Sequence, residues 1–96
     1  MRPSAALSLY RTQIRAIALR HHLTAVRVFG SALRGDDVDG SDLDLLVDAA
    51  PGVTLFDLGG VQDELQELMG LPVEVVTAKD LPVTFRAQVI AEARPV

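Results

Sequence analysis

The regular alternation of helical and strand patterns over only 96 residues is the feature that most restricts the fold of this chain. In the helical segments, apolar residues recur every three or four positions, whereas short runs rich in β-branched and leucine residues indicate strands. The helical segments are 4–22, 31–34, 54–70 and 80–93, and the strand segments are 25–29, 43–47 and 73–77. This order, α-β-α-β-α-β-α, predicts one α/β domain spanning residues 1–96, in which helices cover a small mixed sheet of about three strands.

Capping residues and glycines predict where the helices begin and where they are perturbed. Ser4, Thr54 and Asp80 are the expected N-caps of the first, third and last helices. Gly59 and Gly60 each cost about 1 kcal/mol relative to alanine inside a helix, so they predict a bend or a close packing contact. The apolar spacing of the last two helices directs Leu55, Leu58, Val61, Leu65, Leu68, Phe85, Val89, Ile90 and Ala93 inward.

The composition excludes several classes of protein. Apolar residues make up 49% of the chain, which is enough for a core and argues against general disorder. The sequence has no cysteine, so disulfide frameworks, thiolate zinc sites and cysteine nucleophiles are excluded. The apolar runs are too short for a membrane span, and a cytoplasmic location is expected.

Charge is distributed unevenly along the chain. Residues 1–35 contain six arginines and no acidic residue, whereas residues 36–96 contain three basic and thirteen acidic residues. A basic first helix could meet an acidic partner or RNA, or it could present a solvated face. The net charge of −4 gives a poor surface for neutralising phosphates, so sequence-independent nucleic-acid binding is disfavoured as the main function, although a local basic patch stays open. Direct, sequence-specific nucleic-acid binding is not expected either.

Two aspartates at the second strand are the first candidate site residues. Side chains alternate along a strand, so Asp42 and Asp44 project to one side while Leu43 and Leu45 project into the core. Like charges this close repel each other unless a cation lies between them. Carboxylate oxygens are hard ligands that suit Mg²⁺, so the pattern predicts a magnesium site.

Glu74 is the one charged residue of the third strand, and it is the candidate third acid. An acidic side chain in an otherwise apolar strand is costly without a partner. Taken alone, Glu74 could form a structural ion pair with an arginine such as Arg27. If the sheet aligns it with Asp42 and Asp44, the three carboxylates could hold two Mg²⁺ ions, which clamp the attacking and leaving oxygens in phosphoryl or nucleotidyl transfer.

A Gly-Ser turn supplies the complementary part of the expected site. Gly30 ends the first strand, and glycine allows the backbone to approach a phosphate closely. Ser31 opens a helical turn, where N–H groups and a hydroxyl can donate to an anion. An anion site beside a metal site is what a nucleoside triphosphate with Mg²⁺ requires.

The combined pattern, Gly-Ser followed after ten residues by Asp-x-Asp, resembles the minimal nucleotidyltransferases (MNT proteins) of the polymerase-β superfamily. The resemblance covers essentially the whole chain and rests on residues 28–31, 34–35, 41–47 and 73–77. It implies the polymerase-β-like nucleotidyltransferase fold, with Gly30 and Ser31 holding the triphosphate of ATP. Arg34 and Ser41 stand at positions typical of the family, where they could touch phosphates.

The same resemblance implies roles for the acids and includes two departures. Asp42, Asp44 and Glu74 would be the catalytic and metal-binding residues. The third acid is often aspartate in this superfamily, which leaves the role of Glu74 as general base open. Leu33 stands where a small residue is common, so the helical turn could pack differently.

The resemblance also implies a partner. MNT proteins of this length resemble antitoxins of type VII toxin–antitoxin pairs, which transfer AMP from ATP to a tyrosine hydroxyl of a HEPN-domain toxin. A domain this small has no second lobe to enclose an acceptor, so the acceptor surface is expected from another chain. Two alternatives stay open: a non-catalytic antitoxin that masks its toxin, and a nucleotidyltransferase acting on a small molecule such as an aminoglycoside.

Other polar or aromatic residues have simpler interpretations. The acidic loop 36–39 lacks the order of a calcium-binding loop and is interpreted as solvated or capping residues. His21 and His22 suit the end of the first helix. Tyr10 lies in the apolar stripe and is expected in the core, whereas Arg86 could reach a phosphate or adenine or lie on the surface.

Overall fold

A computed structural model describes residues 1–96 as one α/β domain whose four strands form a single mixed sheet in the order β3-β2-β1-β4. The elements are α1 (Pro3–Arg20), β1 (Leu23–Phe29), α2 (Ser31–Arg34), β2 (Leu43–Ala49), α3 (Leu55–Met69), β3 (Val73–Val76), the 3₁₀ helix η1 (Ala78–Asp80), α4 (Val83–Glu92) and β4 (Arg94–Pro95). Strand β1 pairs antiparallel with β2 and β4, whereas β2 and β3 run parallel. The predicted α/β class and the mixed sheet are therefore confirmed.

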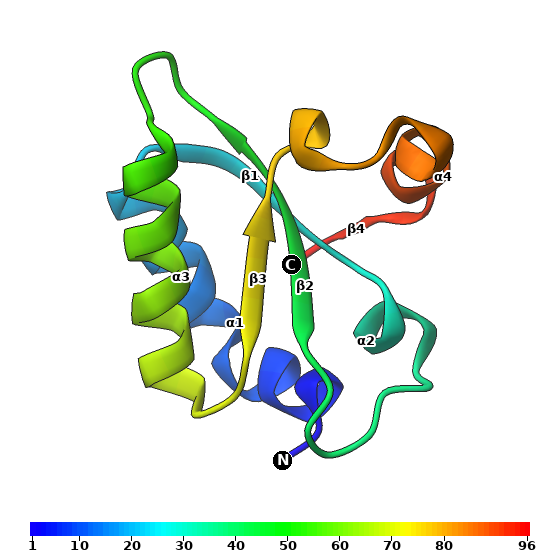
Figure 1. Cartoon of the computed structure of the whole chain (residues 1–96). Helices are drawn as coiled ribbons and strands as arrows, with labels where there is room; N and C mark the ends of the chain where they lie inside the picture. Colours follow the sequence, from blue (N-terminus) through cyan, green and yellow to red (C-terminus); the bar gives the residue numbers. More distant parts are fainter.

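The helices cover the two faces of the sheet unequally (Figure 1). Helices α1 and α3 lie side by side on one face, and between them and the sheet lies a core of 17 buried residues. On the opposite face a cluster of only three buried residues, Leu46, Leu81 and Ala93, joins β2 to the segment around α4. This second face, which we call the open face, is therefore only partly covered.

Alternation along β2 explains which side chains reach each face. Leu43, Leu45 and Val47 are fully buried in the larger core, as the strand pattern predicts. Asp44 and Leu46 point to the other side. The open face thus receives both an acidic side chain and part of the smaller apolar cluster.

The C-terminal part of the chain differs from the prediction. Residues 94–95 add a fourth strand at the edge beside β1, although two residues that include a proline carry no strand pattern. Asp80 does not cap the last helix, because it ends η1 and accepts hydrogen bonds from the backbone N–H and hydroxyl of Thr77. Helix α4 begins only at Val83.

Several apolar side chains expected inside are exposed. Phe85 and Ile90 on α4 are 44% and 39% exposed, and Leu55 on α3 is 76% exposed. Helix α4 has no fully buried residue and packs mainly through Val89. Apolar spacing alone could not show that this helix meets only the small cluster on the open face.

The expected signals at α3 are confirmed at its start and end. Thr54 and Asp57 form a reciprocal capping box, and Gly70 ends the helix in a left-handed conformation with φ of 69°.

No helix of the structure is both long and apolar enough to cross a bilayer.

Gly59 and Gly60 make no close packing contact, contrary to one of the expected alternatives. A Cβ atom built at either position meets nothing within 4 Å. We therefore expect Gly59→Ala and Gly60→Ala each to stabilise the protein by about 0.5–1 kcal/mol, because alanine costs less conformational entropy in a helix. Chemical denaturation measures the effect, and a lower free energy of unfolding in either variant would show a contact that this structure lacks.

Candidate active site

The Gly-Ser turn lies where β1 ends on the sheet and α2 begins. Gly30 adopts φ of 73° and ψ of −151°, a conformation essentially restricted to glycine. A Cβ atom at this position would stand 2.5 Å from Oδ2 of Asp44, which is closer than any real contact. The absence of a side chain at Gly30 therefore keeps the Asp44 carboxylate accessible from the turn.

The parallel pairing of β2 and β3 brings two of the predicted acids side by side. Asp44 is the register partner of Glu74, and Phe29 is the partner of Asp44 on the other side. All three therefore project to the open face at one end of the sheet. Glu74 is exposed rather than buried, because β3 is an edge strand whose open face carries little cover here.

The neighbouring groups and the partial burial of Asp44 change the pKa of its carboxyl group. Partial burial raises the pKa of Asp44 to about 6, and the adjoining Glu74 carboxylate, through its charge and a shared hydrogen bond, adds to the effect. The charge of Asp42 contributes in the same direction, whereas Arg34 opposes it. The structure thus places a carboxylate cluster where a cation would relieve repulsion.

Asp42 and the proposed phosphate contacts lie at the edge of this cluster. Asp42 is exposed immediately before β2, and no group of three or more histidine or acidic side chains converges on a single metal position. Arg34 pairs with Asp36 at 3.3 Å, and the hydroxyl of Ser41 accepts the N–H of Val38 at 3.0 Å. Their roles in phosphate binding stay predictions.

The carboxylates fit a divalent cation by their chemistry. Asp44 and Glu74 offer hard oxygen ligands side by side, and the charge of Glu74 adds to the partial burial that raises the pKa of Asp44. Asp42 and Glu74 are both exposed. A cation here would be held by Asp44 and Glu74, with Asp42 as the third proposed ligand.

The raised pKa of Asp44 predicts a pH-dependent stability of the metal-free protein. Folding favours the protonated form of this carboxyl group. Below about pH 4 the group is protonated in both the folded and the unfolded state, and it does not affect stability. Above about pH 6 it is charged in both states, and the charge lowers the free energy of unfolding by its full amount. After allowance for solvent screening, we expect wild type to lose about 1 kcal/mol across this range relative to Asp44→Asn. Urea unfolding of both proteins in a chelating buffer at pH 4–7 tests this difference, and parallel pH profiles would contradict it.

The structure also decides two alternatives left open by the sequence. Arg27 lies 3.4 Å from Asp48 and forms no ion pair with Glu74. Arg86 donates to the main-chain oxygens of Lys79 and Leu81, so it ties η1 to α4. Tyr10 packs against the larger core, as expected.

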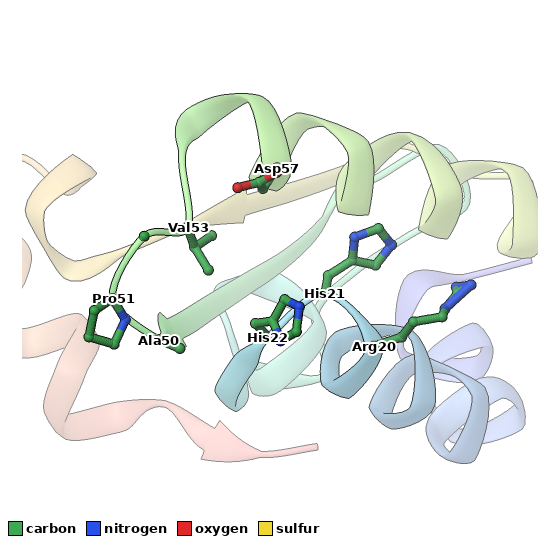
Figure 2. A pocket seen from close by; sticks show the side chains of 8 residues that line it. Arg20, His21, His22, Ala50, Pro51, Val53 and Asp57 are labelled. Atoms are coloured by element: carbon green, nitrogen blue, oxygen red, sulfur yellow. The ribbon is translucent and has the colours of Figure 1, made fainter.

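His21 and His22 lie far from the carboxylate cluster, at the opposite end of the sheet. They line a hollow of about 520 Å³ between the end of α1 and the start of α3, together with Arg20 and Asp57 (Figure 2). His21 contacts Glu64 at 2.8 Å, and Arg20 also pairs with Glu64. None of the predicted site residues lines this hollow.

An α/β sheet that presents paired carboxylates beside a Gly-Ser turn defines a class of enzymes that transfer phosphoryl or nucleotidyl groups. Residues 11–96 match the nucleotidyltransferase domain family. The chain therefore belongs to this family, and the expected enzyme class is confirmed.

Two relatives lie near this chain in sequence. It is 31% identical over 83 residues to MJ0435 of Methanocaldococcus jannaschii, named as a proposed protein adenylyltransferase, with coverage of 86% of this chain and 89% of the relative. It is 38% identical to the solved structure of a proposed minimal nucleotidyltransferase, with a TM-score of 0.85 and coverage of 97% and 95%. These matches confirm the minimal nucleotidyltransferase fold.

A more distant solved structure shares the fold. A chain of the complex of a tri-AMPylated Shewanella oneidensis HEPN toxin with an MNT antitoxin aligns with a TM-score of 0.69 at 18% identity. The alignment covers 92% of this chain and 69% of that chain. In that complex, the toxin carries AMP groups.

Proposed function

We propose that this protein is a Mg²⁺-dependent adenylyltransferase that moves AMP from ATP to a hydroxyl group of a partner protein. The observation that carries the proposal is the close approach of Gly30 to Asp44, with Glu74 in register beside that carboxylate. A turn without a side chain next to paired acids would allow a phosphate and a cation to bind side by side. The name of the M. jannaschii relative supports adenylyl transfer.

In the proposed reaction, Gly30 and Ser31 hold the triphosphate, and Arg34 and Ser41 add contacts to it. Asp42, Asp44 and Glu74 would hold Mg²⁺, which supplies charge neutralisation on the phosphates and lowers the pKa of an oxygen bound to it. Two ions are proposed.

The transfer forms one bond and breaks one. The acceptor oxygen attacks the α-phosphorus of ATP, the bond from that phosphorus to the bridging oxygen of the β-phosphate breaks, and pyrophosphate leaves. The hydroxyl proton passes to a base, for which Glu74 and Asp44 are the candidates.

The acceptor is proposed to be a tyrosine of a HEPN-domain toxin, which would make this chain its antitoxin. The carboxylates lie on the open face of the sheet, which the helices of this domain cover only in part. An acceptor carried by another protein can approach from that side. The AMPylated toxin of the distant structural relative supports this choice of partner.

Transfer of labelled AMP tests the reaction and its requirements. The protein is incubated with a HEPN-domain protein encoded beside it, ATP labelled at the α-phosphate and Mg²⁺, and the labelled chain is identified on a denaturing gel. We expect label on the partner, none after chelation of Mg²⁺, and none from ATP labelled at the γ-phosphate. Label from the γ-phosphate would overturn adenylyl transfer in favour of phosphorylation.

A further inference from the structure

The loop that joins the Gly-Ser turn to the acids is fastened by residues from the start of the chain. Residues 35–42 run from the end of α2 to the start of β2, so the loop connects the turn at Gly30 and Ser31 to Asp42. Its own backbone hydrogen bonds are few: Gly35 donates to Ser31 at its beginning, and Ser41 donates to Val38 near its end. The middle of the loop is held from outside.

Arg2 supplies most of this attachment. Its Nε donates to the main-chain oxygen of Asp37 at 3.0 Å, and its Nη2 donates to the main-chain oxygen of Gly35 at 3.1 Å and to Oδ1 of Asp37 at 3.0 Å. One guanidinium group therefore binds the loop at two residues, Gly35 and Asp37. Such a fork is available to arginine but not to lysine.

Asp37 completes the attachment from the side of the loop. Its Oδ2 accepts the backbone N–H of Ser4 in the first turn of α1 at 2.7 Å, in place of the missing side-chain cap at Arg2. Asp37 is 3% exposed and is the one charged residue buried in the structure. These hydrogen bonds, the one from Ser4 first, hold the pKa of Asp37 below its usual value.

We infer that Arg2 and Asp37 are positioning residues for nucleotidyl transfer, which fix the loop between the phosphate-holding turn and the metal-binding acids. The inference rests on the proposed function. Neither residue need touch the nucleotide. A loop that carries Asp42 at its end and follows Gly30 and Ser31 at its start determines whether both groups face one triphosphate, and small displacements of positioned groups reduce rates strongly.

The test compares Arg2→Ala, Asp37→Ala and the double variant with wild type. The control is Val38→Ala, which shortens a 64% exposed side chain in the same loop. Asp39 is left unchanged, because its Oδ1 accepts from the N-terminal ammonium of Met1 at 2.7 Å and so belongs to the same attachment. All proteins are assayed at a temperature at which circular dichroism shows each to be fully folded. The measurements are kcat and KM for AMP transfer, the Mg²⁺ concentration for half-maximal rate, and the Kd for Mg–ATP by calorimetry.

We expect each single variant to lower kcat about tenfold or more and to raise the Mg²⁺ requirement, because the loop loses its fixed position. The double variant should show no larger fall in kcat than either single variant, because both residues belong to one attachment. Val38→Ala should match wild type in all three measurements. Variants that unfold at a lower temperature but keep the wild-type kcat, Mg²⁺ requirement and Kd would overturn the inference and leave a purely structural contact.

The assay separates failure of the inference from failure of the proposed function. If wild type transfers no AMP to its partner, the proposed function fails. The Kd for Mg–ATP then decides the inference: about tenfold weaker binding in the variants supports it, and unchanged binding overturns it. If wild type and all variants transfer AMP equally, the inference alone fails.

Discussion

Replacing Asp44 with asparagine is expected to abolish AMP transfer, with a loss in rate of about 10³-fold or more. The change removes the negative charge from the carboxylate that lies between Gly30 and Glu74 while keeping its size. Asp42→Asn is expected to have a comparable effect, because it removes another proposed ligand. Initial rates of label transfer at saturating ATP and Mg²⁺ measure the loss.

Asp48→Asn is the matched control for this prediction. Asp48 lies on the same strand and the same side as Asp44, four positions further along, where it contacts Arg27 at 3.4 Å. It should keep full activity. Asp44→Asn should remain folded and, at neutral pH without metal, should be at least as stable as wild type, since the residue it replaces carries an unfavourable charge there. Wild-type activity in Asp44→Asn would remove the carboxylates from the mechanism.

Replacing Gly30 with alanine is expected to reduce both stability and activity severely. A new Cβ would lie 2.5 Å from Oδ2 of Asp44, and the backbone at φ of 73° and ψ of −151° strains any residue with a side chain. Strain and overpacking together should cost about 2–5 kcal/mol of unfolding free energy. Thermal and urea unfolding measure the cost, and transfer assays on the folded fraction measure the loss of activity.

Gly52→Ala separates the strain of the backbone from the contact. Gly52 also has a positive φ, of 95°, but it lies between β2 and α3, away from the carboxylates, and a Cβ there meets nothing within 4 Å. This variant should lose about 1–2 kcal/mol of unfolding free energy from strain alone and keep its activity once folded. Equal effects of the two substitutions would show that the closeness of Gly30 to Asp44 has no consequence.

Much of the fold could be predicted from local sequence patterns. The strand around Leu43 and Leu45 alternates cleanly, and the capping box at Thr54 is a signal contained within four residues. Alternation predicts Asp42 and Asp44 on one side of the strand, but β2 begins only at Leu43, so the side of Asp42 stays a prediction. That Glu74 lies beside Asp44 required the further assumption that β2 and β3 are neighbours in register, which the sheet confirms.

The features that sequence reasoning missed depend on distant contacts. The strand at residues 94–95 forms because the chain end returns to β1, and its two residues contain no pattern of their own. Asp37 belongs to an acidic segment that was interpreted as a solvated loop. It is instead buried against the start of α1, where it accepts from Ser4, which is 33 positions away in sequence. Ser4 was expected to cap α1 with its side chain, but that helix begins at Pro3 and the cap comes from Asp37.

Intact mass analysis of both chains, after incubation of this protein with the proposed HEPN-domain partner, ATP and Mg²⁺, shows most directly whether AMP is transferred to a protein. We expect the partner to gain the mass of one or more AMP units with wild type and with Asp48→Asn, and to gain none with Asp44→Asn. A stable complex with no mass gain on either chain would contradict this expectation and favour an antitoxin that masks its toxin. AMP found on a small molecule such as an aminoglycoside, and on neither protein, would contradict it in favour of the other alternative.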